Sequence, residues 1–203
     1  MITMKTWYER KRNRAWWHDY SSPGVYFITI CTRNREHYFG EISNKKMQIS
    51  EIGKIACQCW EKMPEISLDI ELDYYGVMPN HLHGIIIITN KTGNRRDGSL
   101  QSGDEDWENR RLQRLPKVMG SYKSVVTRMA NDIPWDLFFG WQRSYYDHII
   151  RNEKSLNIIR RYILNNPANW SEDLENPGYI SGMSKEERES RLDDHYNNLF
   201  KYD

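Results

Sequence analysis

The hydrophobic pattern of residues 25–163 changes its period several times, and the order of these changes limits the folds open to the chain. Residues 25–32 read VYFITICT between Ser-Ser-Pro-Gly and Arg-Asn-Arg, which predicts a strand. A helix is expected to open at Ser50 and end at Pro64. Its single apolar stripe consists of Ile52, Ile55, Ala56, Cys59, Trp60 and Met63. Two strands follow over residues 68–78 and 82–89, separated by Pro79-Asn80.

The second half of the pattern continues with a helix and another strand. Pro116 opens a predicted helix whose apolar face holds Val118, Tyr122, Val125, Val126 and Met129, and residues 141–150 predict a strand. A further helix carries Leu156, Ile159 and Ile163 and ends before Pro167, and Ser184 opens another over residues 185–198. The order β–α–β–β–α–β predicts an α+β, ferredoxin-like (split βαβ) fold. We expect an antiparallel sheet with helices on one face, the other face free to hold a site, and a C-terminal helical extension.

Cysteine usage and hydropathy exclude several classes of protein. The three cysteines are an odd number without zinc-finger spacing, which argues against a disulfide scaffold. The longest aliphatic run is Ile85–Ile88, and the N-terminus has no apolar block typical of a signal peptide. We therefore expect a soluble protein of a reducing compartment, the cytoplasm.

The net charge of +1 hides an uneven distribution along the chain. Residues 171–203 carry four Lys and Arg against nine Asp and Glu, whereas residues 1–170 carry 25 against 19. The expected organisation is a basic, aromatic arm (1–20), a domain (21–170) with an exposed loop at 90–114, and an acidic extension (171–203). A basic body suggests a polyanionic partner. An ordinary domain with a solvated tail explains the charges equally well.

The segment MPNHLHG at residues 78–84 is the most informative motif. On a strand, His81 and His83 point to one face and Leu82 to the other. Two imidazoles on one face, beside a glycine that lets a backbone or ligand approach, make a plausible half of a metal site. The alternative is a chance pair among the six histidines of the chain.

Tyr162 and Asn166 lie four residues apart on the expected helix and therefore share a face. A tyrosine is a weak nucleophile at its ordinary pKa of about 10 and needs an electropositive neighbour. Arg160 and Arg161 adjoin it in sequence. The alternative is a tyrosine that only packs.

Residues 141–151 combine aromatic side chains with Arg143 and Arg151, a mixture that favours single-stranded nucleic acid. A strand with a buried aromatic side is the alternative interpretation.

The ordered motifs together resemble one family, the HUH single-tyrosine transposases, and most closely the REP-associated tyrosine transposases. The segments that carry this resemblance are YFITICTR (26–33), MPNHLHG (78–84), WQR (141–143), DHIIR (147–151), YI (162–163) and NP (166–167). The resemblance implies that His81, His83 and Asn166 hold a divalent ion, Mg²⁺ or Mn²⁺, and that Tyr162 is the nucleophile. Because imidazole is softer than an oxygen ligand, Mn²⁺ competes seriously with Mg²⁺.

The resemblance also implies a substrate and a reaction. The substrate is single-stranded DNA with a hairpin (a REP-like repeat), cut and rejoined through a 5′-phosphotyrosine intermediate. Candidates for backbone contacts are Arg143, Arg151, Lys117 and Lys123, and candidates for base stacking are Trp141, Tyr145 and Tyr146. The arm and the extension lie outside the matched region, and whether the chain is a monomer or a homodimer stays open.

Two other functions remain compatible with the sequence. One is a non-catalytic regulator that binds hairpin DNA, and the other is a metal-dependent phosphodiesterase that uses water. Formation of a covalent protein–DNA adduct distinguishes the nicking and joining enzyme from both.

Overall fold

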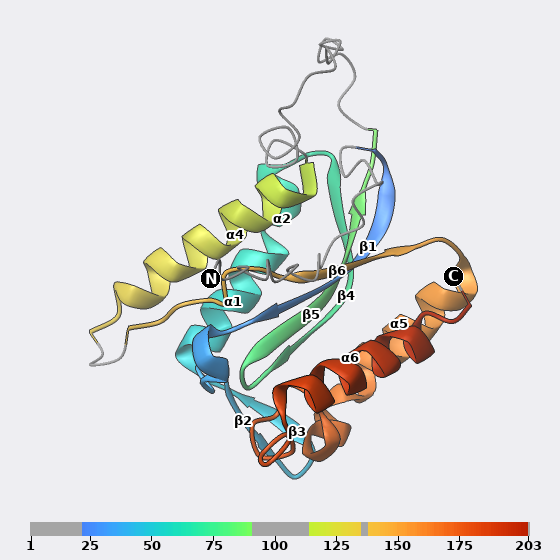
Figure 1. Cartoon of the computed structure of the whole chain (residues 1–203). Coiled ribbons are helices and arrows are strands. Elements are labelled where there is room, and N and C mark those ends of the chain that lie inside the picture. Colours follow the sequence, from blue (N-terminus) through green and yellow to red (C-terminus); the bar gives the residue numbers. More distant parts are fainter. Residues whose placement is uncertain (1–21, 91–113, 135–137, 203) are drawn as a thin grey trace, which may run out of the picture.

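The computed structural model describes residues 22–90, 114–134 and 138–202, and its centre is a four-stranded antiparallel sheet (Figure 1). The strand order is β4-β5-β1-β6. The strands are β1 (Gly24–Cys31), β4 (Ile70–Met78), β5 (His81–Ile88) and β6 (Tyr146–Ile150). Because β5 lies between β1 and β4, the first β–α–β unit is split. The predicted ferredoxin-like sheet is therefore confirmed.

One face of the sheet is covered by α1 (Glu51–Glu61) and α4 (Arg114–Asn131), with the single turn α2 (Met63–Ile66) between α1 and β4. Ser50 caps α1 as predicted, because its side chain accepts a hydrogen bond from the backbone N–H of Gly53. The even-numbered residues of β1 point into this first core cluster, whose fully buried members include Tyr26, Ile28, Ile30, Trp60 and Leu82. The buried positions of α4 are Leu115, Met119, Tyr122, Val126 and Ala130, so its apolar face is rotated from the predicted one and Met129 is exposed.

The opposite face is covered as well, by α5 (Glu153–Asn165) and α6 (Lys185–Leu199), as Figure 1 shows. These helices are joined through the 3₁₀ segment η2 (Asn166–Glu172) and a loop. Phe27 of β1, Ile85 of β5 and Ile150 of β6 point to this face and meet the helices in a second core cluster, whose other members are Leu156, Ile159, Ile163 and Phe200. The expectation of a free second face is thus wrong. The apolar stripe of α5 and the aromatic side of α6 are removed from water by packing against this face of the sheet, which is favourable.

Some local structure differs from the sequence-based expectation. A hairpin of β2 (Gly40–Ser43) and β3 (Lys46–Ile49) was not predicted; both residues of its turn, Asn44 and Lys45, have positive φ. Residues 33–35 form the short 3₁₀ segment η1. The fourth strand begins at Tyr146 rather than residue 141, and Trp141 makes only an isolated bridge with Thr32.

Two predicted segments cannot be compared with the structure. The arm (1–20) and nearly all of the loop at 90–114 lie outside the described residues. Within the described residues, no helix combines the length and apolar character required to cross a membrane, and all three cysteines are free thiols.

Candidate active site

The two histidines of the MPNHLHG motif lie side by side on β5, facing α5 and α6. The two-residue period of the strand places Leu82 in the first core cluster and both imidazoles on the opposite face, as predicted. The rings are almost completely buried, with exposed fractions of 0% for His81 and 1% for His83. Their Nε2 atoms lie 3.0 Å apart. The pair therefore offers two nitrogen atoms to one point.

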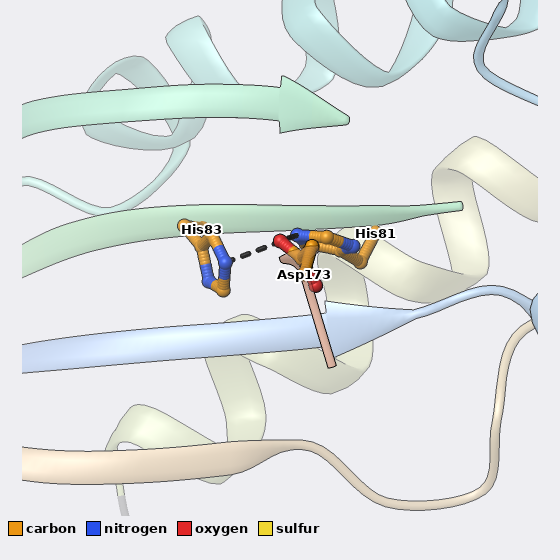
Figure 2. A group of neighbouring side chains, drawn as sticks. All are labelled: His81, His83 and Asp173. Atoms are coloured by element: carbon orange, nitrogen blue, oxygen red, sulfur yellow. Dashed lines mark hydrogen bonds and ion pairs between the residues drawn. The ribbon is translucent and has the colours of Figure 1, made fainter. Parts of the chain in front are cut away.

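Asp173 brings a carboxylate to the same point (Figure 2). Its Oδ2 lies 3.8 Å from the Nε2 of His81, and ligand atoms of the three residues all fall within 4.8 Å of one another. Asp173 directly follows η2, in the segment that the sequence analysis treated only as an acidic extension. Nothing in the spacing of its nine acidic residues distinguishes this one, so the sequence carried no signal for it.

Tyr162 reaches the site from α5. Its hydroxyl oxygen lies 3.2 Å from the Nε2 of His83. Ile159 and Ile163, on the same helix, are buried in the second core cluster and hold this face of α5 against the sheet. Two segments that are distant in sequence therefore place a phenol beside the imidazole pair.

Asn166 caps the C-terminal end of α5, one turn beyond Tyr162. It is only 4% exposed, and its amide nitrogen has no hydrogen-bond partner among the described residues. The Asn166 side chain lowers the pKa of both Tyr162 and Asp173 against the opposing effect of burial. The structure thus brings together Tyr162, His81, His83 and Asn166, the four residues that the resemblance grouped into one site.

Burial determines the protonation states of the site. It lowers the pKa of His81 to about 4 and that of His83 well below its ordinary value, so both rings are neutral at pH 7. Burial raises the pKa of Asp173, and it raises the pKa of Tyr162 well above its ordinary value. The negative charges of Asp173 and Glu175 raise the Tyr162 pKa further. A phenolate at this position therefore requires additional positive charge.

The neighbouring arginines do not provide that charge. Arg160 forms an ion pair with Asp73 on β4, with contacts of 3.0 Å (Nε–Oδ1) and 2.5 Å (NH2–Oδ2). Arg161 is exposed and donates through its Nε to the backbone oxygen of Asn157. The idea that sequence adjacency lets Arg160 and Arg161 activate Tyr162 is corrected, because side chains next to each other on a helix leave it in different directions.

A divalent cation fits this set of residues. Ligand atoms about 2.1 Å from an ion at angles of 90–109° lie about 3.0–3.4 Å apart, close to the separations of 3.0 and 3.8 Å found here. The two imidazoles are neutral, as ligands must be, and the carboxylate supplies charge. The Asn166 side chain acts on the same carboxylate, because it lowers the pKa of Asp173. The His81, His83 and Asp173 group can therefore hold a metal ion.

The glycine of the motif has a different role from the expected one. A Cβ on Gly84 would lie 2.2 Å from Cζ2 of Trp60, on the face opposite the histidines. Gly84 lets the Trp60 ring pack against β5 and does not open the strand to a ligand.

The three aromatic residues expected to stack on bases are used in packing. Tyr145 is 7% exposed within the first core cluster. The indole Nε1 of Trp141 donates to the backbone oxygen of Lys123, and the ring of Tyr146 stacks on Tyr196 at 4.0 Å. The interpretation of residues 141–151 as a strand with buried aromatic rings therefore describes these side chains better.

The four predicted phosphate-binding residues fall into two groups. The Nζ of Lys123 donates to the backbone oxygen atoms of Gln142, at 2.6 Å, and Arg143, at 3.3 Å, and so supports the loop before β6. Lys117, Arg143 and Arg151 are exposed. None of the four lies in the His81–His83–Asp173 group.

The C-terminal extension contributes a second residue that the sequence analysis missed. The ring of His195, on α6, lies 5.3 Å from the ring of Tyr162. Burial lowers the pKa of His195, and the Asp173 carboxylate opposes this effect. The extension is therefore part of the site as well as part of the second core cluster.

Comparison with known proteins gives one clear relative. No protein-family model matches the chain. A Haemophilus influenzae protein, described as an uncharacterized protein, is 38% identical over 167 residues, which span 82% of this chain and 92% of that one. The chain belongs to the same family as that protein.

Two solved structures are also similar to the chain. One is a REP-associated tyrosine transposase bound to a REP hairpin, with a TM-score of 0.46 and 18% identity, covering 72% of this chain and 68% of that one. The other is a putative transposase from Deinococcus radiodurans R1, with a TM-score of 0.39 and 16% identity, covering 78% and 97%. With both TM-scores below 0.5, the proposal for the function depends on the geometry of the site.

Proposed function

We propose that the chain is a metal-dependent, transposase-like enzyme that nicks and rejoins single-stranded DNA beside a hairpin, with Tyr162 as its nucleophile. The observation that supports this most is the contact between the Tyr162 hydroxyl and the Nε2 of His83, at 3.2 Å. A nucleophile and a pair of metal-binding nitrogen atoms then share one buried position. In the metal-free chain the contact satisfies the tyrosine hydroxyl, and it also places the phenol oxygen beside the ring atom that the ion would use.

The residues of the chain have distinct roles in this reaction. His81, His83 and Asp173 hold the divalent ion, which supplies positive charge that stabilises a phenolate and polarises a phosphodiester. The Tyr162 oxygen forms a bond to phosphorus while the bond from phosphorus to the 3′ oxygen breaks, and a free 3′-hydroxyl leaves. The resulting 5′-phosphotyrosine retains the energy of the phosphodiester, so a later 3′-hydroxyl reverses the exchange and rejoins the strand without ATP.

The surroundings of Tyr162 explain why the reaction depends on a cation. Burial and two nearby carboxylates raise its pKa, so the hydroxyl keeps its proton at pH 7 when no ion is present. The amide of Asn166 acts in the opposite direction and favours the phenolate. We infer that Asn166 stabilises the nucleophile or completes the ligand set. Of the two ions that the resemblance implies, Mg²⁺ and Mn²⁺, the imidazole donors favour Mn²⁺, because imidazole is softer than an oxygen ligand.

Exposed basic side chains outside the metal group are the proposed contacts to DNA. Arg143, Arg151 and Lys117 contribute salt-sensitive affinity without choosing a sequence. The structure gives Lys123 a supporting role in the loop that carries Arg143.

The test is a denaturing gel of the full chain with end-labelled, hairpin-flanked single-stranded DNA and Mn²⁺. Wild type should form a covalent adduct, and Tyr162→Phe, which loses only the hydroxyl, should form none while still binding the hairpin. Tyr146→Phe is the matched control and should form the adduct, because its ring stacks on Tyr196 rather than on either histidine. His83→Ala, or excess EDTA with wild type, should abolish cleavage.

The same gel separates the alternative functions. Cleavage that releases free ends and never an adduct would identify a phosphodiesterase that uses water. Hairpin binding without cleavage by wild type under any divalent ion would identify a non-catalytic regulator. Either result would refute the role of Tyr162.

A further inference from the structure

Asn80 connects the first metal-binding histidine to two other segments of the chain. It lies in the turn between β4 and β5 and is fully buried. Its Nδ2 donates to the backbone oxygen of Arg35, at 3.2 Å, and to that of Glu175, at 2.7 Å. Its Oδ1 lies 2.9 Å from the Nδ1 of His81. One side chain thus joins η1, β5 and the C-terminal extension.

These contacts determine which nitrogen of His81 carries the proton. Both partners of Nδ2 are carbonyl oxygens, which only accept, so the amide cannot be turned over without placing its own oxygen against them. The atom that faces His81 is therefore Oδ1, an acceptor, and the Nδ1 of His81 must donate to it. A neutral imidazole has one N–H, so its Nε2 is left with a free lone pair directed at the Nε2 of His83 and at Asp173.

The tautomer of the second histidine, His83, is not determined by its contact. The Nδ1 of His83 lies 2.8 Å from the Oγ1 of Thr29, and a hydroxyl can either donate or accept. The Thr29 contact is therefore compatible with a proton on either nitrogen of His83. Asn80 therefore fixes the tautomer of His81, whereas the Thr29 contact leaves that of His83 open.

Asn80 also acts on the carboxylate. The carbonyl that it binds most closely belongs to Glu175, two residues beyond Asp173. The loop between these residues is short and tied internally, because the backbone N–H of Glu175 donates to the Asp173 Oδ1 at 2.6 Å. The position of Asp173 relative to His81 is thus set through the same amide.

We propose that Asn80 is the positioning residue of the metal centre, which holds the His81 proton on Nδ1 and fixes the Asp173 segment against the same ring. This rests on the proposed role of His81, His83 and Asp173 as metal ligands. Contacts of this kind, one shell away from the ion, typically change metal affinity by about 10–100-fold when removed.

Titration of the full chain with Mn²⁺, followed by calorimetry and by the electron paramagnetic resonance signal of free Mn²⁺, measures this effect without requiring activity. Asn80→Ala should bind Mn²⁺ at least about 10-fold more weakly than wild type. Asn131→Ala is the matched control. Its amide also donates to a backbone oxygen, that of Phe139 at 3.3 Å, and accepts from the N–H of Phe139 at 2.8 Å, but it lies on α4, which covers the other face of the sheet. Its affinity should stay within about threefold of wild type, well below the change expected for loss of a contact to a ligand.

The outcomes separate this inference from the proposed function. If His81→Ala binds Mn²⁺ as well as wild type, the metal site itself is refuted. If His81→Ala loses binding but Asn80→Ala keeps it, or if Asn131→Ala loses as much as Asn80→Ala, the positioning role is refuted.

A second measurement does not depend on the Asn80 variants folding. A long-range ¹H–¹⁵N spectrum of the metal-free wild-type chain reports the tautomer of each histidine, with His81 assigned through His81→Gln. The expected result is a protonated Nδ1 and a bare Nε2 for His81. A protonated Nε2 would overturn the inference.

Discussion

Acidification of the metal-free protein from pH 7 to pH 5 should cost a defined amount of stability through His81. Its pKa is about 4 in the folded chain, because the ring is fully buried, and about 6.5 when unfolded. The unfolded chain therefore binds more protons than the folded chain between these two values. The stability that the neutral His81 ring contributes is fully present above pH 6.5, and this contribution is lost as the pH falls toward 4.

The magnitude follows from the two pKa values. Protonation of the unfolded form to pH 5 favours unfolding by about 2 kcal/mol relative to pH 7, since the folded ring remains almost entirely neutral. For a chain of this size that corresponds to a fall in Tm of about 4–8 °C. Burial of His83 acts in the same direction. Most carboxylates titrate below pH 5, so this interval isolates the histidines.

Urea unfolding with EDTA at pH 7 and pH 5 measures the effect, and His81→Gln provides the comparison because glutamine does not titrate. The loss of unfolding free energy between the two pH values should be about 2 kcal/mol smaller in this variant than in wild type. Equal losses in the two proteins would mean that His81 is not buried as a neutral ring. The assignment of His81 as a neutral ligand of the metal centre would then be refuted.

Two further perturbations test the packing around the site. Gly84→Ala should destabilise the fold by about 1–3 kcal/mol, because the new methyl meets the Trp60 ring, whereas Gly120→Ala on α4 meets nothing within 4 Å and should stabilise by up to about 1 kcal/mol. Thermal unfolding of both variants checks this, and a tolerated Gly84→Ala would contradict the packing role. A double-mutant cycle of Asp73→Asn and Arg160→Gln should give a coupling of about 1–2 kcal/mol, since the two-contact ion pair is partly buried. No coupling would mean that this pair does not anchor α5.

Periodicity predicted most of the secondary structure because each pattern depends on near neighbours. The strand period placed His81 and His83 on one face, and the helical period placed Tyr162 and Asn166 within one turn. Both capping serines, Ser50 and Ser184, accept the hydrogen bonds that their positions predict. The hairpin of β2 and β3 was not predicted, because its turn is Asn44-Lys45 and lacks the glycine that usually marks such turns.

The relative placement of distant segments was beyond the reach of local patterns. Sequence alone left the second face of the sheet empty and treated the acidic extension as separate, although its aromatic residues pack against Phe27 and Tyr146. It also assigned Tyr145 to base stacking, since a strand of aromatic residues looks the same whether its neighbours are solvent or core.

The sequence by itself determined which side chains share a face: the imidazole pair on one strand, and the phenol and amide on one helix. Only the tertiary structure decided that these two faces meet, that Asp173 joins them and that Asn80 orients His81. The physical reason lies in the range of the forces involved. Backbone geometry repeats every two to four residues, so the spacing of neighbouring residues predicts which side chains share a face. The contact between α5, α6 and β5 depends instead on the burial of apolar surface from segments far apart in the chain.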